Sequence, residues 1–197
     1  MPATVSKPRR SSKAAAAREE ILAVAARMMR QNGYADMSLR DLAKEVSMKA
    51  GSLYYHFASK DALATEVMRL GVEGVQKAVE EALAAQPDVS AKERLIIAMR
   101  VHLETLLSES DFSSAHIRCY PFVPDAVRAE LTTIRKGYDK DWNDLICAHL
   151  NKPVETVEVR HLRHALLGAL NWSLEWFDPE RDDVDAYVSS LSPLLSQ

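Results

Sequence analysis

The side chains best suited to chemistry lie in one stretch, from Ser38 to Lys60, which reads SLRDLAKEVSMKAGSLYYHFASK. This stretch carries hydroxyl, phenol, imidazole, guanidinium and ammonium groups within a short length of chain. Groups of these kinds hydrogen-bond to phosphate oxygens and to the edges of bases. A lysine can bond guanine edges, and a hydroxyl can bond several bases. The chemistry available here is therefore that of binding a nucleic acid.

The signatures of common catalytic and metal sites do not occur in the sequence. It has no GxSxG elbow, phosphate-binding glycine loop, HExxH motif or catalytic Cys-His signature. Cys119 and Cys147 lack the CxxC spacing of a zinc site, and His161 and His164 have no third ligand nearby in sequence. We expect no enzyme, no metal and no cofactor. A catalytic pocket assembled from scattered helices, acting on a coenzyme A ester, is kept as an alternative.

Three helices are expected to position the Ser38–Lys60 stretch. Apolar residues at helical spacing predict a helix over 13–32, which Asn32 and Gly33 end. Ser38 caps the next helix, and a tight turn leads to a short helix over about 49–56. The first helix must supply the floor for the inner side chains of the other two, which are Leu42, Val46, Leu53 and Phe57. One side of helix 49–56 then stays exposed, which is the arrangement that presents a helix to the major groove.

Charge is distributed unevenly along the chain. Residues 1–60 hold 11 Lys and Arg against 5 Asp and Glu, a net of +6, whereas the remainder has a net of −9. A basic head on an acidic body suits a head that meets a polyanion. The first 12 residues are expected to be a flexible basic arm in which Lys7, Arg9 and Arg10 add phosphate or minor-groove contacts. No membrane span or signal peptide is evident, so we expect a cytoplasmic protein with no membrane partner.

The rest of the chain also has a helical pattern. Ser59 is expected to cap a helix that runs to about residue 85, and Gly71 and Gly74 within it allow a bend or a close helix approach. Ser90 and Glu93 form a capping box for the next helix. Residues 109–123 look less regular, and three more helices are expected over 125–150, 155–177 and 182–195. We predict an all-α fold of about nine helices, with a helix-turn-helix domain over 13–58 and an effector-binding and dimerisation domain over 59–197.

The Ser38–Lys60 stretch and its flanks resemble the TetR family of transcriptional regulators. The resemblance covers about residues 18–65 and is carried by NGY at 32–34, SLRDLA at 38–43, GSLYYHF at 51–57 and SKDAL at 59–63. Two positions depart from the family pattern. Ser47 stands where the turn usually carries glycine, and Lys49 stands where the recognition helix is often capped by Ser or Thr. Both departures bear on how the recognition helix sits, and so on its base contacts.

The resemblance implies a set of residues that contact DNA. Tyr54 and Lys60 are expected to anchor phosphates, and Gly51 to keep the backbone close to the duplex. The remaining candidates face the groove or the flanking strand, and they are Ser38, Arg40, Lys49, Ser52, Tyr55 and His56.

The resemblance also implies a homodimer, because two recognition helices match a palindromic operator. The last two helices are the family's usual dimer face. The stripes expected to form it here are Leu162, Leu166, Ala169, Trp176, Val184, Tyr187, Val188 and Leu191.

The segment LLGALNWSLEWFDPE at 166–180 resembles a subgroup of TetR-like repressors that control lipid or sterol degradation and respond to acyl-CoA thioesters. This resemblance implies a long apolar pocket in the body, because methionine and aromatic side chains suit an apolar ligand. Its expected lining is Met68, Met99, His102, Phe112, Tyr120, Phe122, Trp142 and Trp172, with Arg118 meeting an anionic group.

Taken together, these features predict a repressor that a small molecule releases from its operator. An architectural DNA-binding protein without an effector is the second alternative. It predicts a body without a cavity and weak sequence preference.

Overall fold

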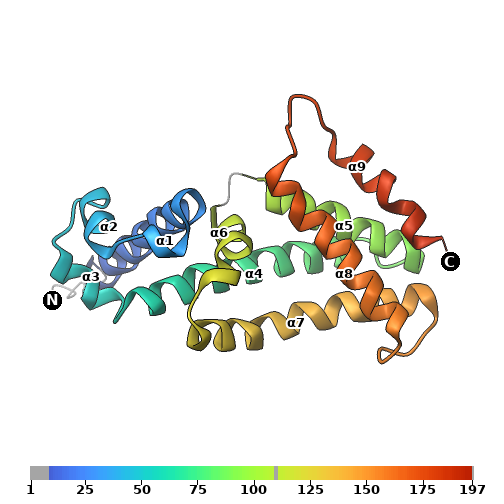
Figure 1. Cartoon of the computed structure of the whole chain (residues 1–197), viewed down its shortest axis with the longest axis horizontal. Coiled ribbons are helices and arrows are strands. Elements are labelled where there is room, and N and C mark those ends of the chain that lie inside the picture. Colours follow the sequence, from blue (N-terminus) through green and yellow to red (C-terminus); the bar gives the residue numbers. More distant parts are fainter. Residues whose placement is uncertain (1–8, 109–110, 197) are drawn as a thin grey trace, which may run out of the picture.

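The computed structural model describes residues 9–108 and 111–196, and every regular element in these two ranges is helical. The α-helices are α1 Arg9–Asp36, α2 Leu39–Glu45, α3 Ala50–His56, α4 Lys60–Ala84, α5 Ala91–Leu107, α6 Asp111–Cys119, α7 Asp125–Leu150, α8 Val157–Trp172 and α9 Val184–Leu191. Short 3-10 turns follow α6, α8 and α9. The predicted all-α fold class is confirmed. Helices α1 to α3, the head, gather at one end, and α4 runs from them into the body formed by α4 to α9 (Figure 1).

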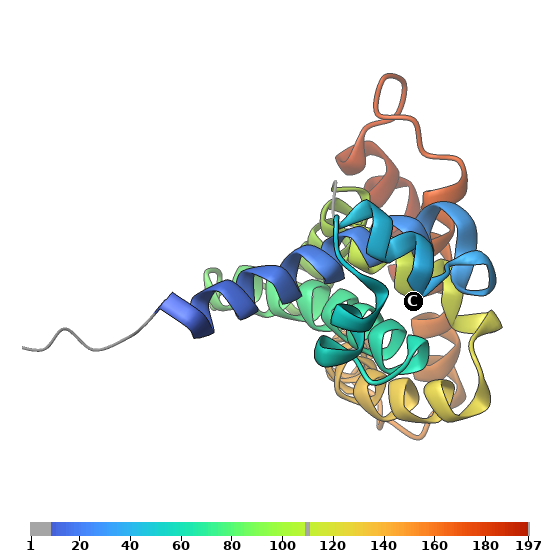
Figure 2. The same cartoon turned by 90° about the vertical axis from the view of Figure 1, so that its left-hand side faces the viewer.

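The start of α1 differs from the expectation. The predicted arm ended at residue 12, but α1 already begins at Arg9, so Arg9 and Arg10 lie in its first turn. Lys7, the other expected arm contact, lies outside the described residues. Figure 2 shows the first turns of α1 reaching beyond the rest of the head.

Local chemistry sets the bounds of the head helices as expected. Gly33 breaks the helical path at φ 78°, a positive value that glycine adopts without steric cost. Ser38 caps α2, and its hydroxyl accepts a hydrogen bond from the Asp41 amide at 3.1 Å. Ser47, in the turn between α2 and α3, has φ 51°, a left-handed conformation that is unusual for a residue with a Cβ.

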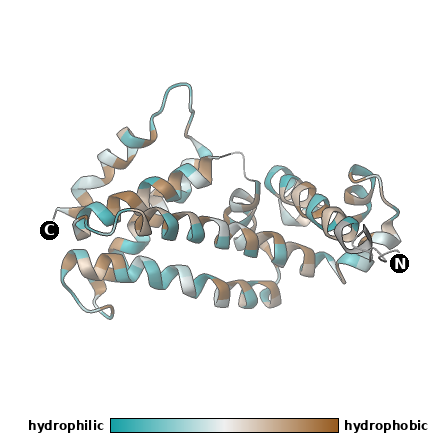
Figure 3. Cartoon of the chain, turned by 180° about the vertical axis from the view of Figure 1, so that it is seen from behind, coloured by the Kyte–Doolittle hydropathy of each residue, from teal (hydrophilic) through white to brown (hydrophobic). Residues whose placement is uncertain are grey.

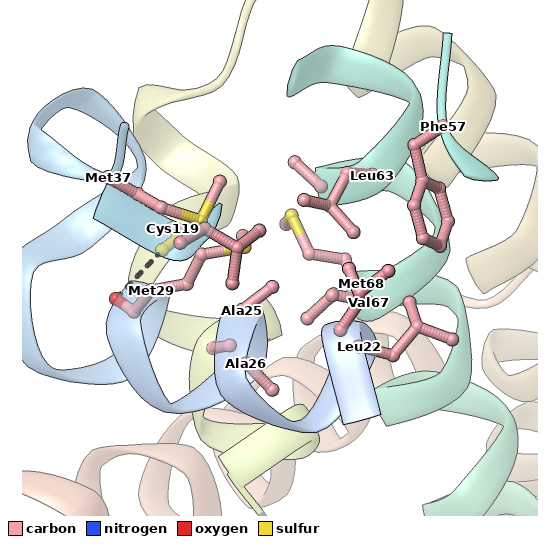
Figure 4. Close-up of a cluster of buried hydrophobic side chains, with 14 of the residues drawn as sticks. Leu22, Ala25, Ala26, Met29, Met37, Phe57, Leu63, Val67, Met68 and Cys119 are labelled. Carbon is pink, nitrogen blue, oxygen red and sulfur yellow. Dashed lines mark hydrogen bonds between the residues drawn. The ribbon is translucent and has the colours of Figure 1, made fainter. Parts of the chain in front are cut away.

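The floor for the head helices is the buried face of α1. Leu42, Val46, Leu53 and Phe57 are all buried in one cluster with the inner residues of α1, as predicted. Figure 4 shows Leu22, Ala25, Ala26 and Met29 of α1 facing Leu63, Val67 and Met68 of α4, with Cys119 of α6 beside them. The core of the head is therefore continuous with the first half of α4 and with α6.

The body has a second core. Its inner residues come from the second half of α4 and from α5, α7, α8 and α9, including Met99, Trp142, Leu166 and Val188. Apolar and polar residues alternate along these helices with a helical period (Figure 3), so each buries one side. None of the helices in the described ranges has the length and hydropathy needed to span a bilayer.

Helix α6 is the main departure from the expected elements. Residues 109–123 look irregular in sequence, yet Asp111–Cys119 form a helix that packs on both α1 and α4. Its approach to α4 is so close that a Cβ on Gly71 would overlap the Phe112 carbonyl group. The close approach proposed for Gly71 is thus present, whereas Gly74 has no neighbour within 4 Å of its would-be Cβ.

These two glycines give opposite predictions for the same substitution. Gly71→Ala should lower the free energy of unfolding by about 1–3 kcal/mol, because α6 would have to move away from α4. Gly74→Ala should raise it by about 0.5–1 kcal/mol, because alanine favours the helix interior and meets nothing. Urea denaturation of both variants measures the difference, and equal stabilities would contradict the close approach.

Candidate nucleic-acid interface and ligand cavity

The outer face of α3 is open to solvent. Leu53 is the only buried residue of this helix, and it anchors α3 to the head core. Gly51 and Ser52 are exposed, and Tyr54 and Tyr55 are 58% and 84% exposed. Lys49, at the N-cap position, is exposed and makes no side-chain cap hydrogen bond. The polar face predicted for helix 49–56 is therefore present on a rigid element.

Three further candidates are Ser38 and Arg40, at the start of α2, and His56, at the end of α3. Arg40 is exposed on α2. The Ser38 hydroxyl donates to the Asp41 carboxylate at 2.6 Å and accepts the capping hydrogen bond from the Asp41 amide. His56 is half-buried with its ring edge-on to Tyr55, at 5.4 Å between ring centroids. The structure thus leaves Arg40 freer to meet a phosphate than Ser38.

Lys60 is held more firmly than the sequence suggested. Its Nζ donates to the Ala35 carbonyl at 2.9 Å and lies 4.4 Å from the centroid of the Tyr34 ring. An ammonium has three donors, so two remain for a phosphate. The Tyr34 hydroxyl in turn donates to Asp61, and burial raises the pKa of Tyr34 to about 12. These contacts fix the start of α4 against the end of α1.

An ion-pair network joins the head to the body. Glu66 on α4 accepts from Arg18 on α1 at 2.5 Å and from Arg69 at 2.7 Å, and Arg69 also pairs with Glu73. Hydrogen bonds from Arg69, and then from Arg18, lower the pKa of Glu66 to about 2, although its partial burial opposes this. The network fixes α1 on α4 at the level of the recognition helix.

A cavity of about 240 Å³ lies inside the body. Two predicted lining residues, His102 and Tyr120, contribute to it. The other residues that line it are Gly71, Val72, Val75, Leu106, Ser113, His116, Ile117, Arg135, Tyr138, Asp139, Leu167 and Asn171. They come from α4, α5, α6, α7 and α8, so every long helix of the body borders the cavity.

A chain of hydrogen bonds orders one wall of this cavity. His102 Nδ1 lies 2.8 Å from the Tyr138 hydroxyl, and His102 Nε2 lies 3.0 Å from Asn171 Oδ1. Since an amide oxygen only accepts, Nε2 carries the proton and the Tyr138 hydroxyl donates to Nδ1. Burial lowers the pKa of His102 to about 4, so its imidazole is neutral at physiological pH. The Asn171 amide nitrogen remains available as a donor at the cavity wall.

None of the other predicted lining residues borders this cavity. Met68, Met99 and Trp142 are fully buried in the two cores, and Phe112 packs against the head core. Phe122 and Trp172 are 74% and 66% exposed, so they face solvent instead of a pocket. Arg118 is committed to Glu175 and to the Leu174 carbonyl. The sequence did not distinguish these places, because an aromatic or methionine residue fits a core or a surface as readily as a ligand site.

Of the cavity residues that the sequence analysis missed, Tyr138 could have been predicted and His116 could not. Tyr138 precedes Trp142 by one helical turn, so a shared inner face could have been predicted. His116 lies on α6, whose regularity was not evident, and so the direction of its side chain could not be inferred. A second hollow of about 540 Å³ lies between α4, α5 and α7, and Tyr138 lines both.

The predicted dimer residues divide into two groups. Leu162, Leu166 and Val188 are buried within the chain's own core, so they are not free to meet a partner. The others are half-buried or exposed, and they are Ala169, Trp176, Val184, Tyr187 and Leu191. The outward side of α8 is instead formed by His161, His164, Ala165, Gly168 and Trp172. No group of three or more potential metal ligands forms around this histidine pair, or elsewhere in the described ranges.

Comparison with known protein families decides the assignment. Residues 21–67 match the family model described as bacterial regulatory proteins of the tetR family, and residues 88–183 match the tetracyclin repressor-like C-terminal domain. The chain belongs to the TetR family. It is therefore a helix-turn-helix regulator and not an enzyme, and the second matched region is the family's ligand-binding domain.

Similar proteins are known in sequence and in structure. The HTH-type transcriptional repressor KstR2 of Mycolicibacterium smegmatis is 39% identical over 62 residues, which are 32% of this chain and 30% of that protein. PfmR of Thermus thermophilus is 25% identical with a TM-score of 0.73, and the match covers 89% of this chain and 96% of that one. AibR, solved in complex with isovaleryl coenzyme A and operator DNA, is 22% identical with a TM-score of 0.72 over 88% and 94% of the two chains.

The acid stability of this TetR-family chain should depend on Glu66. Its folded pKa lies below the unfolded value of 4.5, so its stabilising contribution is complete above that value and is lost as pH falls towards 2. Glu66→Gln should lower the free energy of unfolding at pH 7 by about 1–3 kcal/mol, and the difference from wild type should shrink below pH 4. Denaturation curves across this pH range provide the measurement.

Glu73→Gln is the matched control, because within the described residues the ion pair of Glu73 is with Arg69 alone and its side chain is 47% exposed. Its effect should stay below about 1 kcal/mol at any pH. A Glu66→Gln difference that does not change with pH would contradict the ion-pair origin.

Proposed function

We propose that this TetR-family chain is a repressor that binds a palindromic operator as a homodimer and is released by a small molecule. The observation that carries the proposal is the open face of α3, where Ser52, Tyr54 and Tyr55 are exposed while Leu53 holds the helix to the head. A helix fixed by its inner side and polar on its outer side can enter a major groove without rearranging. The basic charge of residues 1–60 supports attraction to the phosphate backbone.

The surface of the body supports a dimer through α8 and α9. A single recognition helix contacts too few base pairs to select one site, and a two-fold pair doubles the readout. The outward side of α8 carries small residues, Ala165 and Gly168, that allow a close helix approach, next to the exposed Trp172. Exposed large apolar groups of this kind mark interaction surfaces.

The cavity supports a small-molecule effector. An architectural DNA-binding protein would need no such hollow, and its polar wall is ordered by His102 and Asn171. The acyl-CoA expectation has support beyond the sequence in the isovaleryl coenzyme A bound by AibR. A hollow of about 240 Å³ lies below the usual range of about 300–1,000 Å³ for drug-sized ligands, so only the acyl end of such a molecule would fit it.

The release mechanism follows from the double role of α6. Ser113, His116 and Ile117 on α6 line the cavity, and the same helix packs on α1 of the head, where the Cys119 thiol donates to the Met29 carbonyl. An effector shifts the position of the heads only by its difference in affinity for the two states. A ligand that fits the cavity better when α6 is displaced would therefore weaken operator binding.

Operator recognition can be tested with duplexes selected from a randomised pool. Lys49→Met and Ser52→Ala should change the preferred sequence, because each lost base contact changes discrimination by about 1–3 kcal/mol. Lys60→Met should weaken binding to all duplexes alike and reduce the slope of log affinity against log salt by about 1.

Gel-shift titrations at several salt concentrations measure both effects. Lys77→Met, an exposed change on α4 in the body, is the control that should leave affinity and slope unaltered. Binding that does not weaken as salt rises would contradict the phosphate anchors.

The dimer can be tested on the outward side of α8. Ala165→Glu should separate the protomers, because a two-fold axis brings two new carboxylates into one desolvated contact. Ultracentrifugation should then show a monomer with strongly reduced operator affinity. Ala129→Glu, on an exposed part of α7, should remain dimeric. A dimeric Ala165→Glu protein would place the interface elsewhere.

A further inference from the structure

The rim of the body cavity carries a positive charge that no acidic side chain of the described residues neutralises. Arg135 lines the cavity and stacks on Tyr120, with its guanidinium carbon 4.5 Å from the ring centroid. No ion pair of Arg135 is formed within residues 9–108 and 111–196. Its guanidinium donors are thus not held by a carboxylate of these residues and can meet an anion in the hollow.

The one acidic group of the cavity is already engaged. Asp139 lies one turn beyond Arg135 on α7, and its carboxylate is 3.7 Å from Arg163 Nη1. The Arg163 guanidinium also donates to the Asp139 carbonyl at 3.4 Å. The charges of Asp139 and Arg163 therefore offset each other, and Arg135 leaves the cavity with a net positive charge.

A second unsatisfied group lines the same hollow. His116 is buried on α6, and its Nδ1 has no hydrogen-bond partner in the described part of the chain. Burial, and then the charge of Arg135, lower the pKa of His116 to about 3, so the imidazole is neutral. A buried polar atom without a partner is uncommon in folded proteins and indicates a missing partner.

Opposite in character to the polar wall of His102, Tyr138 and Asn171, another part of the lining is apolar. It is formed by Val72, Val75, Leu106, Ile117 and Leu167. A ligand that satisfies all of these features has one anionic head and a short apolar body. We infer that the effector of this regulator is a small amphipathic carboxylate, with its charged head on Arg135 and accepting a hydrogen bond from His116 Nδ1, and with its apolar part between α4, α5 and α8. This inference rests on the proposed effector-responsive function.

Calorimetric titration of the full chain with octanoate and phenylacetate, each beside its methyl ester, tests the inference. The ester keeps the shape and removes the charge. At least one acid should bind tenfold or more tightly than its ester, because charge-assisted hydrogen bonds are the strong ones. Arg135→Met should remove this preference, and Arg135→Lys should keep most of it. Lys136→Met, one residue along on the exposed side of α7, should leave it unchanged.

In His116→Leu the new side chain fills a similar volume but cannot form the hydrogen bond, so acid binding should weaken several-fold. Thermal melting confirms that this variant is folded. Esters that bind as tightly as acids, or an acid preference that survives in Arg135→Met, would overturn the inference. Binding of octanoyl coenzyme A in the absence of any acid binding would also overturn it. Operator binding is measured separately by gel shift. If the unliganded protein binds no operator, the proposed function is overturned. If it binds an operator and no acid releases it, only the inferred ligand class is overturned.

Discussion

The burial of α1 on two sides is the constraint on which the rest of the molecule depends. Ile21, Ala25 and Met29 are fully buried, and their cluster includes residues of α2, α3, α4 and α6. The recognition helix therefore has no core of its own, because Leu53 packs into a cluster that also holds Met68. The domain boundary predicted after residue 58 therefore does not coincide with a boundary between the two cores. Any displacement of α6 or α4 reaches α3 through packed side chains.

Polar contacts fix the position of α1 on α4 and α6 more precisely than apolar burial alone does. The Glu66 network joins α1 to α4, Arg30 pairs with Asp111 of α6 at 2.7 Å, and Lys60 reaches the end of α1. Apolar surfaces tolerate small sliding movements, whereas ion pairs and hydrogen bonds have defined geometries. The head is thus held to the body by polar contacts from the middle of α1 to its end.

The sequence predicted the head well and the ligand cavity poorly, for a physical reason. The exposed face of α3 follows from caps and spacing within a few turns of chain, and such local signals are strong. Helix α6 was missed because it has only nine residues and because three of the residues on its buried side, Ser113, Ser114 and His116, are polar. Similarly, the apolar period of α8 shows that Leu162 and Leu166 are buried. It does not show whether their partners lie in the same chain or in a second copy.

The turn at Ser47 indicates which interactions fix the angle between α2 and α3. A left-handed serine costs more than glycine in backbone strain, but it loses less conformational freedom on folding, so the two effects partly cancel. The turn adopts this conformation because Leu42, Val46 and Leu53 are all buried on α1 and impose it from both sides. The conformation of the turn is consequently set by the packing of the two helices. A substitution at residue 47 can therefore leave the orientation of the recognition helix unchanged.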